Sequence, residues 1–428
     1  MKIALQTWGS QGDINPFIAL SAALVERGHE VSLAITSAHR KDYNAEAENY
    51  GFTLYKTDFI GESEEALEKI AIRLFKSTDP MEQFKIVCTE MLEPSIDGCY
   101  QTALELCETH DLIIGHFFLH AVAIAAEKTN TPYISVSLNH GAIPSAENPP
   151  AGLPNLGKWF NKVFWKLAVH FINKASLPYM NRLRLQAGLP EAHSYRDMWE
   201  SKLCNLIAVS PLICSPKSDW EPYQKVCGLL ETRHEASNWQ MPAELETFLQ
   251  KEPAPVYMTF GSAAGITIHK EEAVEAARLL TEAAKIAKCR AIVQAPWEII
   301  EGIEDDPNIY RITASPYDQI FPRCAAVVHH GGSGTTQTTL LCGKPSVVVA
   351  HINDQLLFGM ELHRLGVAPK LLKRQTVTPN ALAKSIETVL NHPEMQQRAQ
   401  QIGNQISKEN GAQSAVDFIE EAIANLKL

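Results

Sequence analysis

Short apolar segments alternate with stretches of helical periodicity along the whole chain. The apolar segments are rich in Val, Ile, Leu and Ala, which is typical of strands buried in a parallel sheet. In the first half they are residues 2–8, 29–35, 112–115, 133–138 and 206–210, and in the second half 256–260, 291–294, 309–312, 325–329 and 346–350. The pattern predicts an α/β protein with two doubly wound units, each built on a parallel sheet.

The length of the chain fits two such units better than one. A chain of 428 residues is too long for a single core and accommodates two domains of about 200 residues each. Residues 231–255 are polar, mixed in charge and contain prolines, which is typical of a linker with one short helix. We therefore expect an N-terminal domain at residues 1–235, a linker at 236–254, a C-terminal domain at 255–405 and a final helix at 406–428 that packs back towards the N-terminal domain.

The composition describes a globular protein and excludes several classes. A net charge of −11 leaves no basic footprint for nucleic acid, and no apolar run reaches the roughly 18 residues needed to cross a bilayer. Residues 2–8 follow no charged leader or cleavage site, so we expect no signal peptide. The nine cysteines lack CxxC spacing and indicate reduced thiols. We expect a cytoplasmic protein, with a membrane-peripheral location as the alternative.

A glycine loop follows the first predicted strand. Its sequence, Gly-Ser-Gln-Gly-Asp-Ile-Asn-Pro at residues 9–16, leads into helical periodicity at 17–27, which Gly28 ends. Two roles are open for Asp13 in this loop. It can cap a helix that begins near Pro16, as Asp often does, or it can serve as a functional carboxylate at the carboxyl end of a parallel strand.

A second glycine segment, His-His-Gly-Gly-Ser-Gly-Thr-Thr at residues 329–336, also joins a predicted strand to a predicted helix, at 336–342. Glycines let a ligand approach the backbone, and the free amides and dipole of a helix start favour a diphosphate. His329, at the end of the strand, can add a donor to the same phosphates. The spacing matches neither GxGxxG nor GxxxxGK[ST], and a simple turn is the alternative. His329 and His330 point to opposite faces of the strand, so the pair cannot easily chelate one metal ion.

The two glycine segments together resemble the GT1 glycosyltransferases. The second resembles the nucleotide-sugar box of that family, roughly His-x-Gly-x-x-Ser/Gly-Thr followed by Asp-Gln, and its His-His-Gly-Gly is typical of the bacterial antibiotic and sterol glucosyltransferase branch. The first resembles the Gly-Ser/Thr-x-Gly-Asp-x-x-Pro loop of the same branch, and the Phe-Gly-Ser at residues 260–262 resembles the start of the family's C-terminal domain. Weaker similarity at residues 210–228 extends the resemblance over most of the chain. The family implies the GT-B fold, with two Rossmann-like doubly wound domains facing across a cleft.

The resemblance implies roles for individual residues. Asp13 takes the place of the catalytic base, and because an ordinary carboxylate is a weak base, we expect burial to raise its pKa. Donor-binding roles fall on Ser10, Ser262, His329, Gly331, Gly332, Ser333, Gly334, Thr335, Asp354 and Gln355. The implied reaction needs no metal and no cofactor besides the nucleotide sugar as co-substrate, because protein groups stabilise the charge of the departing diphosphate.

The implied activity is the inverting transfer of a hexose to a hydroxyl of a hydrophobic small molecule. The expected donor is UDP-glucose, and the expected acceptor is a sterol, a phenolic or flavonoid, a polyketide or a macrolide. Gln337 stands where plant members have a Glu that holds the ribose, so dTDP-sugars remain an alternative donor. Two other classes stay open, a non-catalytic nucleotide-sugar-binding protein and another enzyme on the same scaffold, such as an epimerase. We expect a monomer or a weak dimer.

One stretch, residues 148–190, contains no acidic residue. Apolar side chains recur at helical spacing beside several lysines, at Trp159, Phe160, Val163, Phe164, Leu167 and Phe171. Three interpretations are open. Trp159, Phe160 and Phe164 can line an acceptor site, the stretch can rest on an anionic membrane, or the helix can pack its aromatic side chains into the N-terminal domain.

Overall fold

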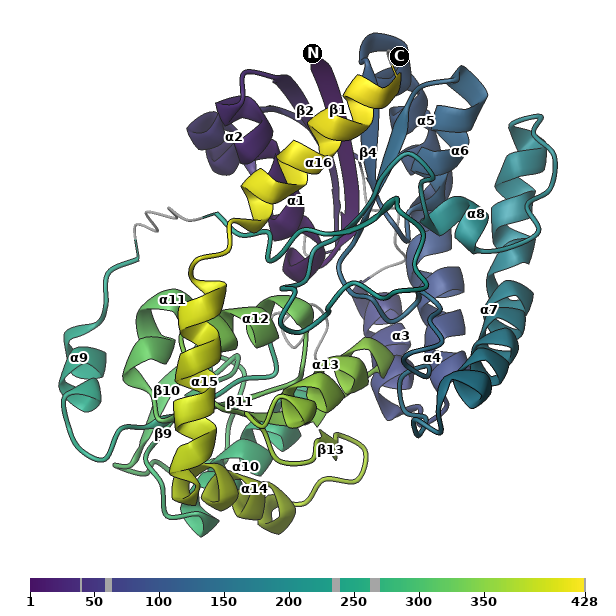
Figure 1. The fold of residues 1–428 in the computed structure, drawn as a ribbon. Coiled ribbons are helices and arrows are strands. Elements are labelled where there is room, and N and C mark those ends of the chain that lie inside the picture. The colour runs from purple at the N-terminus through teal and green to yellow at the C-terminus, as the bar shows by residue number, and fades with distance from the viewer. Residues whose placement is uncertain (39–40, 58–63, 233–238, 262–269, 427–428) are drawn as a thin grey trace. The chain divides into compact units, whose positions relative to one another are not determined.

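The computed structural model describes residues 1–38, 41–57, 64–232, 239–261 and 270–426 (Figure 1). The chain divides into two compact units. Unit 1 comprises residues 1–63, 79–233 and 409–428, and unit 2 comprises residues 64–78 and 234–408. Each unit is built on one parallel sheet.

The sheet of unit 1 has seven strands in the order β3-β2-β1-β4-β5-β6-β7. They are β1 (Lys2–Gly9), β2 (Glu30–Ser37), β3 (Thr53–Lys56), β4 (Leu112–His116), β5 (Tyr133–Ser137), β6 (Asn205–Ile207) and β7 (Gln224–Val226). The order reverses between β1 and β4, which pair with each other although β2 and β3 come between them in sequence. Ligands bind at such a switch point, outside the carboxyl ends of the strands. The residues that follow β1 and β4 are therefore the first candidates for a site.

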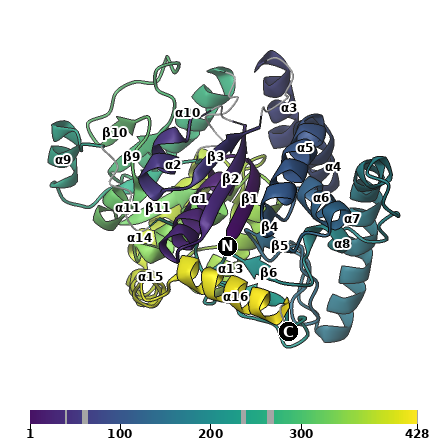
Figure 2. The ribbon, with the colours of Figure 1, turned by 90° about the horizontal axis from the view of Figure 1, so that it is seen from above.

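Helices cover both faces of this sheet, as Figure 2 shows from above. They are α1 (Gln11–Glu26), α2 (Asn44–Tyr50), α4 (Pro80–Ile86), α5 (Glu93–Thr109), α6 (His120–Thr129), α7 (Lys158–Gln186), α8 (Arg196–Trp199) and α16 (Gly411–Leu426), with a π-helical turn at Val87–Leu92. Ile3 and Leu5 of β1 pack in one core with α1 and α16, whereas Ala4 and Trp8 pack in a second core with α5 and α6. Because successive strand residues point to opposite faces, β1 serves both cores.

The C-terminal helix α16 is part of unit 1. Val416 and Ile419 are fully buried in the core that α1 also lines. On the surface, Arg27 at the end of α1 forms an ion pair of 2.8 Å with Asp417. The last twenty residues therefore complete the same core that the first twenty begin, and Figure 1 shows α16 lying beside α1.

The sheet of unit 2 repeats the topology of unit 1, with the order β10-β9-β8-β11-β12-β13. Its strands are β8 (Val256–Met258), β9 (Ala291–Gln294), β10 (Ile309–Ile312), β11 (Ala326–His329), β12 (Ser346–Ala350) and β13 (Leu372–Lys373). Its helices are α3 (Glu64–Lys76), α9 (Ala243–Leu249), α10 (Lys270–Ile286), α11 (Tyr317–Ile320), α12 (Ser333–Leu341), α13 (Asn353–Arg364), α14 (Pro379–Asn391) and α15 (Pro393–Ile406), with a 3-10 turn at Phe321–Arg323. Here the switch point lies between β8 and β11.

Helix α3 groups with unit 2, although its sequence lies within the expected N-terminal domain. The ring of Phe75 stands 5.8 Å from the ring of His351, centroid to centroid, and Gln375 Nε2 donates to the carbonyl of Phe75 at 3.1 Å. These contacts are distant in sequence, so no local pattern indicates them. Residues 64–78 therefore interrupt unit 1 in sequence.

The prediction of two doubly wound α/β units is confirmed. Every predicted strand occurs, with ends shifted by a few residues. The strands that the prediction omits, β3, β7 and β13, are short and lie at or near the sheet edges. No helix of the described residues is both long and apolar enough to span a membrane.

Candidate active site

Asp13 lies in the first turn of α1, directly after β1. The backbone N–H and the hydroxyl of Ser10 both donate to Asp13 Oδ2, at 2.8 and 2.9 Å, while Ser10 Oγ accepts from the N–H of Gly12 at 3.2 Å. This reciprocal arrangement is a capping box. The helix therefore begins at Gln11, and the expectation that it begins near Pro16 is wrong, because the capping residues lie at the start of the glycine loop. Asp13 caps the helix and is still 34% exposed, so the two roles considered for it are compatible.

His116, the last residue of β4, faces the other oxygen of the same carboxylate. Its Nε2 lies 3.6 Å from Asp13 Oδ1, slightly beyond hydrogen-bond length. The N–H of Phe118 donates to His116 Nδ1 at 3.3 Å, so Nδ1 is an acceptor and the ring proton lies on Nε2, the atom that points at Asp13. The adjacency of β1 and β4 brings the two side chains together at the switch point of the sheet.

The pKa of Asp13 is lowered from its ordinary value. Burial alone would raise it, but the interaction with His116 and the two donations from Ser10 together outweigh burial. The expectation of a raised pKa is therefore wrong, although burial itself acts in the expected direction. The structure instead keeps Asp13 ionised at neutral pH, so the group is always ready to accept a proton.

An aromatic cluster continues from His116 into the interior of unit 1. The ring of Phe117 stands 4.9 Å from His116 and 5.5 Å from Trp199, and the ring of Phe118 stands 5.1 Å from Trp199. Phe117 and Phe118 are only partly buried. The carboxylate thus lies next to apolar surface that can contact a hydrophobic ligand. Sequence analysis missed His116 and Phe117, and the available signal was their position after a strand predicted to lie in the same sheet as the first strand.

In unit 2, His329 ends β11 and is fully buried. Its Nδ1 accepts from the N–H of Gly331 at 3.1 Å, which places the ring proton on Nε2. Nε2 has no hydrogen-bond partner among the described residues. Burial lowers the pKa of His329 to about 3, with a smaller contribution from neighbouring His330. His329 is therefore a buried neutral imidazole with an unsatisfied N–H, which a ligand oxygen would satisfy.

The start of α12 provides further donors beside His329. Helix α12 begins at Ser333, and its first intrahelical hydrogen bond runs from the N–H of Thr336 to the carbonyl of Gly332 at 2.9 Å. The amides of Ser333, Gly334 and Thr335 precede that bond, at the positive end of the helix dipole. The predicted start at Thr336 is thus three residues late. The difference matters because it puts Ser333, Gly334 and Thr335 in the first turn, where anions bind.

Glycines are required in this segment by the space around them. Gly331 has φ +91°, and a Cβ there would lie 2.9 Å from both the Gln355 carbonyl oxygen and Val348 Cγ1. Gly261 and Gly332 lie against the buried ring of His330, and a Cβ on either would overlap that ring. Burial lowers the pKa of His330 to about 4, so this imidazole is also neutral. The glycines therefore hold a tightly packed turn and are not simply a flexible loop.

The other predicted donor-binding residues lie around the same strand ends. Gln355 Oε1 accepts from the N–H groups of His351 at 2.7 Å and Ile352 at 3.3 Å, so it caps the start of α13. Asp354, in the first turn of that helix, is partly exposed. Gln337 is buried and donates through Nε2 to Ser333 Oγ at 3.2 Å. Ser262 lies outside the described residues. The structure therefore brings His329, the α12 turn and Gln355 together within unit 2, and Ser10 and Asp13 together within unit 1.

The three predicted acceptor-binding residues lie on the first turns of α7. Trp159 and Phe160 are 69% and 45% exposed, whereas Phe164 is partly buried. No group of three or more His, Cys, Asp or Glu side chains within the described residues is placed to hold a metal ion.

Residues 263–421 match the family described as Erythromycin biosynthesis protein CIII-like, C-terminal domain. Over 445 residues the chain is 28% identical to a sterol 3-beta-glucosyltransferase of Neurospora crassa, and the match covers 98% of this chain and 27% of that protein. The chain thus spans about a quarter of that relative. It is also 28% identical over 438 residues to O-mycaminosyltylonolide 6-deoxyallosyltransferase of Streptomyces fradiae, where the match covers 98% of this chain and 97% of the relative.

Solved structures extend the similarity to the whole fold. The glycotransferase of kitacinnamycin superimposes with a TM-score of 0.69 at 18% identity, over 98% of both chains. SsfS6, a glycosyltransferase of Streptomyces sp. SF2575 solved with thymidine diphosphate, gives a TM-score of 0.65 at 17% identity, over 98% of this chain and 99% of its own. At these identities the likeness establishes a shared fold.

Proposed function

We propose that the chain is a GT1 glycosyltransferase, which moves a hexose from a nucleoside-diphosphate sugar to a hydroxyl of a hydrophobic small molecule, and its similarity to the named glycosyltransferases supports this proposal. The observation that carries this proposal is the Asp13 carboxylate at the switch point of unit 1. Ser10 fixes one of its oxygens, and the other faces His116. A carboxylate held ionised and one-third exposed at a strand end is placed to accept a proton from a bound hydroxyl.

We propose that Asp13 acts as the general base. As the acceptor oxygen attacks the anomeric carbon, its proton passes to Asp13 Oδ1. A bond forms between that oxygen and the anomeric carbon while the bond from this carbon to the diphosphate breaks, so the sugar is transferred with inversion of configuration. Because the pKa of Asp13 is lowered, its proton affinity is reduced, and its role as a base depends on its ionisation and its position.

His116 is proposed as a positioning residue for this base. Its Nε2–H points at Asp13 Oδ1 from a site fixed by the Phe118 amide. This contact favours the ionised carboxylate and one rotamer of Asp13. The acceptor hydroxyl would then meet the same oxygen from the exposed side, with the partly buried Phe117 beside it.

Unit 2 is proposed to bind the diphosphate of the donor. The phosphate oxygens would accept hydrogen bonds from the Nε2–H of His329 and from the amides of Ser333, Gly334 and Thr335. These hydrogen bonds would strengthen as negative charge develops on the leaving group. Neutral His329 suits this role because it can donate without first gaining a proton. The same proposal gives Gly331 and Gly332 the task of exposing the backbone, and gives Ser10, Ser262, Asp354 and Gln355 contacts to the donor.

For the nucleotide and sugar, we propose UDP-glucose, and dTDP-sugars are the second candidate. Glucose is supported by the fungal relative named as a sterol glucosyltransferase. The second candidate is favoured by Gln337, which donates to Ser333 and stands where plant members have the Glu that holds the ribose, and by the structural neighbour solved with thymidine diphosphate.

A sterol or macrolide acceptor is supported by the two relatives, with Trp159, Phe160 and Phe164 as further contacts. All nine cysteines are free thiols, which supports a cytoplasmic reaction.

The experiment that tests the function has a binding step and a turnover step. Thermal shifts with UDP, UDP-glucose, dTDP and dTDP-glucose identify the donor, since a ligand at a hundred times its Kd stabilises the folded state by about 2.7 kcal/mol. Mass spectrometry of the protein with that donor and a panel of sterols, macrolides and phenolics then detects the glycoside. A shift without any product would favour a non-catalytic binding protein, and the absence of any shift would overturn the proposal.

A further inference from the structure

An apolar surface extends from the loop before α7 along the first half of that helix. Its large exposed hydrophobic residues are Leu153, Leu156, Trp159, Phe160, Leu167 and Phe171, with exposed fractions from 39% to 69%. Surfaces of this kind, where several large apolar side chains gather within a few turns, mark sites of interaction. We call residues 153–171 the α7 apolar surface.

The geometry of α7 puts the central residues of this surface on one side. At about 100° per residue, Phe160, Leu167 and Phe171 lie within roughly 40° of one another. The opposite side is fixed to unit 1, where Trp165 Nε1 donates to the carbonyl of Asn148 at 2.7 Å and Asn161 Nδ2 donates to that of Ala146 at 2.9 Å. Trp165 is thus covered. Of the predicted stripe, Val163 and Phe164 are partly buried, and the other members are exposed.

Exposed lysines flank the apolar side chains. Lys158, Lys162, Lys166 and Lys174 are all exposed, and residues 148–190 contain no Asp or Glu in a chain of net charge −11. Lys158 lies near the carboxylates of Glu147 and Asp219. Within the described part of the chain, the other three lysines form no ion pair. The α7 apolar surface is therefore locally cationic on an anionic protein.

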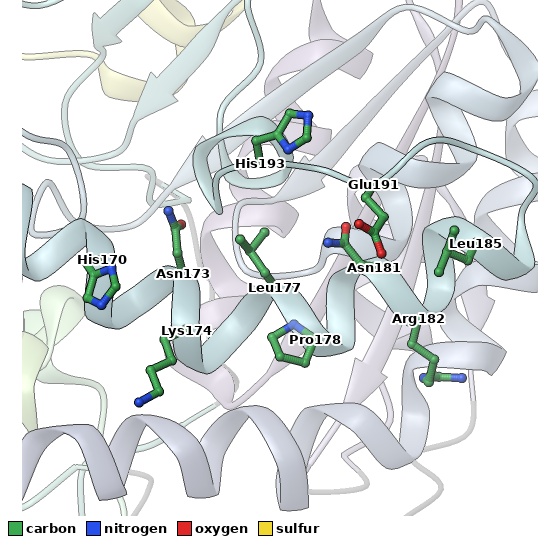
Figure 3. Close-up of a pocket in the computed structure, with 10 residues that line it drawn as sticks. All are labelled: His170, Asn173, Lys174, Leu177, Pro178, Asn181, Arg182, Leu185, Glu191 and His193. Atoms are coloured by element: carbon green, nitrogen blue, oxygen red, sulfur yellow. The ribbon is translucent and has the colours of Figure 1, made fainter.

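A groove of about 670 Å³ continues along the same helix beyond Phe171. Figure 3 shows His170, Lys174 and Leu177 on α7, with His193 and Glu191 across from them on the following loop. Its lining combines apolar carbon with cationic and imidazole groups and with the carboxylate of Glu191. The groove and the α7 apolar surface adjoin on α7, where His170 belongs to both.

We propose that the α7 apolar surface binds the surface of a bilayer that contains anionic phospholipid. Trp and Phe side chains would enter the boundary between headgroups and acyl chains, while the lysines would lie at the level of the phosphates. A second copy of the chain fits less well, because a two-fold contact through this surface would set the lysines of one protomer against those of the other. Membrane binding itself does not depend on the proposed function. Its consequence does, because a membrane would concentrate a dissolved acceptor near the protein only if the protein is a glycosyltransferase.

Vesicle flotation tests this proposal with the full chain. The protein is mixed with vesicles of phosphatidylcholine alone or of phosphatidylcholine with phosphatidylglycerol, at low and high salt. We expect flotation with the anionic vesicles, weaker flotation at high salt, and none with the neutral vesicles. Failure of the unaltered protein to float with anionic vesicles at low salt overturns the proposal.

Paired variants assign the binding to this surface. Leu167→Ser with Phe171→Ser removes apolar contacts, and Lys162→Glu with Lys166→Glu removes cations, which should weaken vesicle binding about thirtyfold or more. Leu390→Ser and Lys384→Glu change exposed residues of α14, and both proteins should float as the unaltered protein does. Equal flotation of the unaltered protein, the two α7 variants and the two α14 variants would overturn the assignment, as would a dimer in analytical ultracentrifugation that the α7 variants convert to monomer.

Activity on a water-soluble phenolic acceptor separates this inference from the proposed function. The α7 variants should keep that activity while losing vesicle binding. If they lose the activity and keep vesicle binding, α7 is an acceptor wall and the membrane proposal fails. If neither the unaltered protein nor any variant transfers a sugar, the proposed function fails. The flotation result would then still show whether the α7 apolar surface binds membranes.

Discussion

Asp13 Oδ1 and His116 Nε2 lie 3.6 Å apart because β1 and β4 are neighbours in the sheet, although two other strands separate them in sequence. Asp13 lies in the connection that follows β1, and His116 is the last residue of the neighbouring strand β4. Switch points of doubly wound sheets bring residues together in this way. The pairing gives a direct set of tests for the proposed base.

Replacing Asp13 with Asn should separate binding from catalysis. The Asn carbonyl can still accept from Ser10, so the start of α1 should keep its cap, but the amide cannot take a proton. We expect kcat to fall about a hundredfold or more with donor binding nearly unchanged. Steady-state kinetics with calorimetric titration of the donor measure both. Weakened donor binding with unchanged turnover of the bound complex would show that Asp13 is not the base.

Replacing His116 with Leu should move the acid limb of the pH profile. His116 lowers the pKa of Asp13, and activity requires the carboxylate, so activity is lost as pH falls through that pKa. Without His116 the pKa rises, and the limb of kcat/KM should shift to higher pH. His116→Gln retains an N–H near the position of Nε2 and should restore part of the shift. A lower rate at every pH with an unmoved limb would instead indicate a purely structural role.

Replacing His329 with Ala should weaken the binding of the free nucleoside diphosphate. The loss of one donor to a charged phosphate corresponds to roughly tenfold to a hundredfold in Kd. His329→Gln keeps a donor near Nε2 and should recover part of the affinity. His363→Ala, in the last turn of α13, is a control that should leave the affinity unchanged. Isothermal titration with UDP or dTDP gives the values. Unchanged affinity in His329→Ala would remove this residue from the phosphate site.

Two glycines three residues apart should respond in opposite ways to Ala. Gly331→Ala forces a side chain into φ +91° and against the Gln355 carbonyl, so we expect a loss of about 1–3 kcal/mol in the free energy of unfolding. A Cβ on Gly334 meets no atom within 4 Å, so Gly334→Ala should leave the free energy equal or raise it by up to about 1 kcal/mol. Urea denaturation measures both. Equal destabilisation by the two changes would contradict the tight turn described at Gly331.

The buried imidazoles should make unfolding depend on pH. The pKa of His329 and that of His330 are lowered to about 3 and about 4, whereas both lie near 6.5 in an unfolded chain. As pH falls below about 6.5, the unfolded state binds protons that the folded state does not, so the free energy of unfolding falls by up to about 1.4 kcal/mol per pH unit for each residue. His330→Gln should reduce this slope by one proton in urea titrations between about pH 6 and pH 5. An unchanged slope would mean that His330 is protonated in the folded protein.

The sequence predicted the architecture because its strands are apolar throughout. Segments such as residues 325–329 and 346–350 are buried on both faces, which leaves little ambiguity. The omitted edge strands β3 and β13 are half-exposed and short, so they have no such pattern. The position of α3 in unit 2 could not be predicted, because contacts such as that of Phe75 with His351 join segments far apart in the chain.

The candidate site was predictable only where one segment holds several of its residues. The turn at residues 329–335 was found because its glycines and His329 are contiguous. His116 was missed because a single histidine after a short strand is unremarkable until the strand order is known. The predicted direction of the Asp13 pKa shift was wrong because the shift depends on His116, which the sequence did not indicate, and on the hydrogen bonds from Ser10.

The placement of α16 has a practical consequence for dividing the protein into fragments. Val416 and Ile419 fill the core between α1 and the first sheet, so a piece ending at residue 233 would leave that core open to water. A recombinant unit 1 should therefore include residues 409–428. If a protease cuts between residues 408 and 409, unit 1 should stay folded only while the cleaved helix remains bound to it.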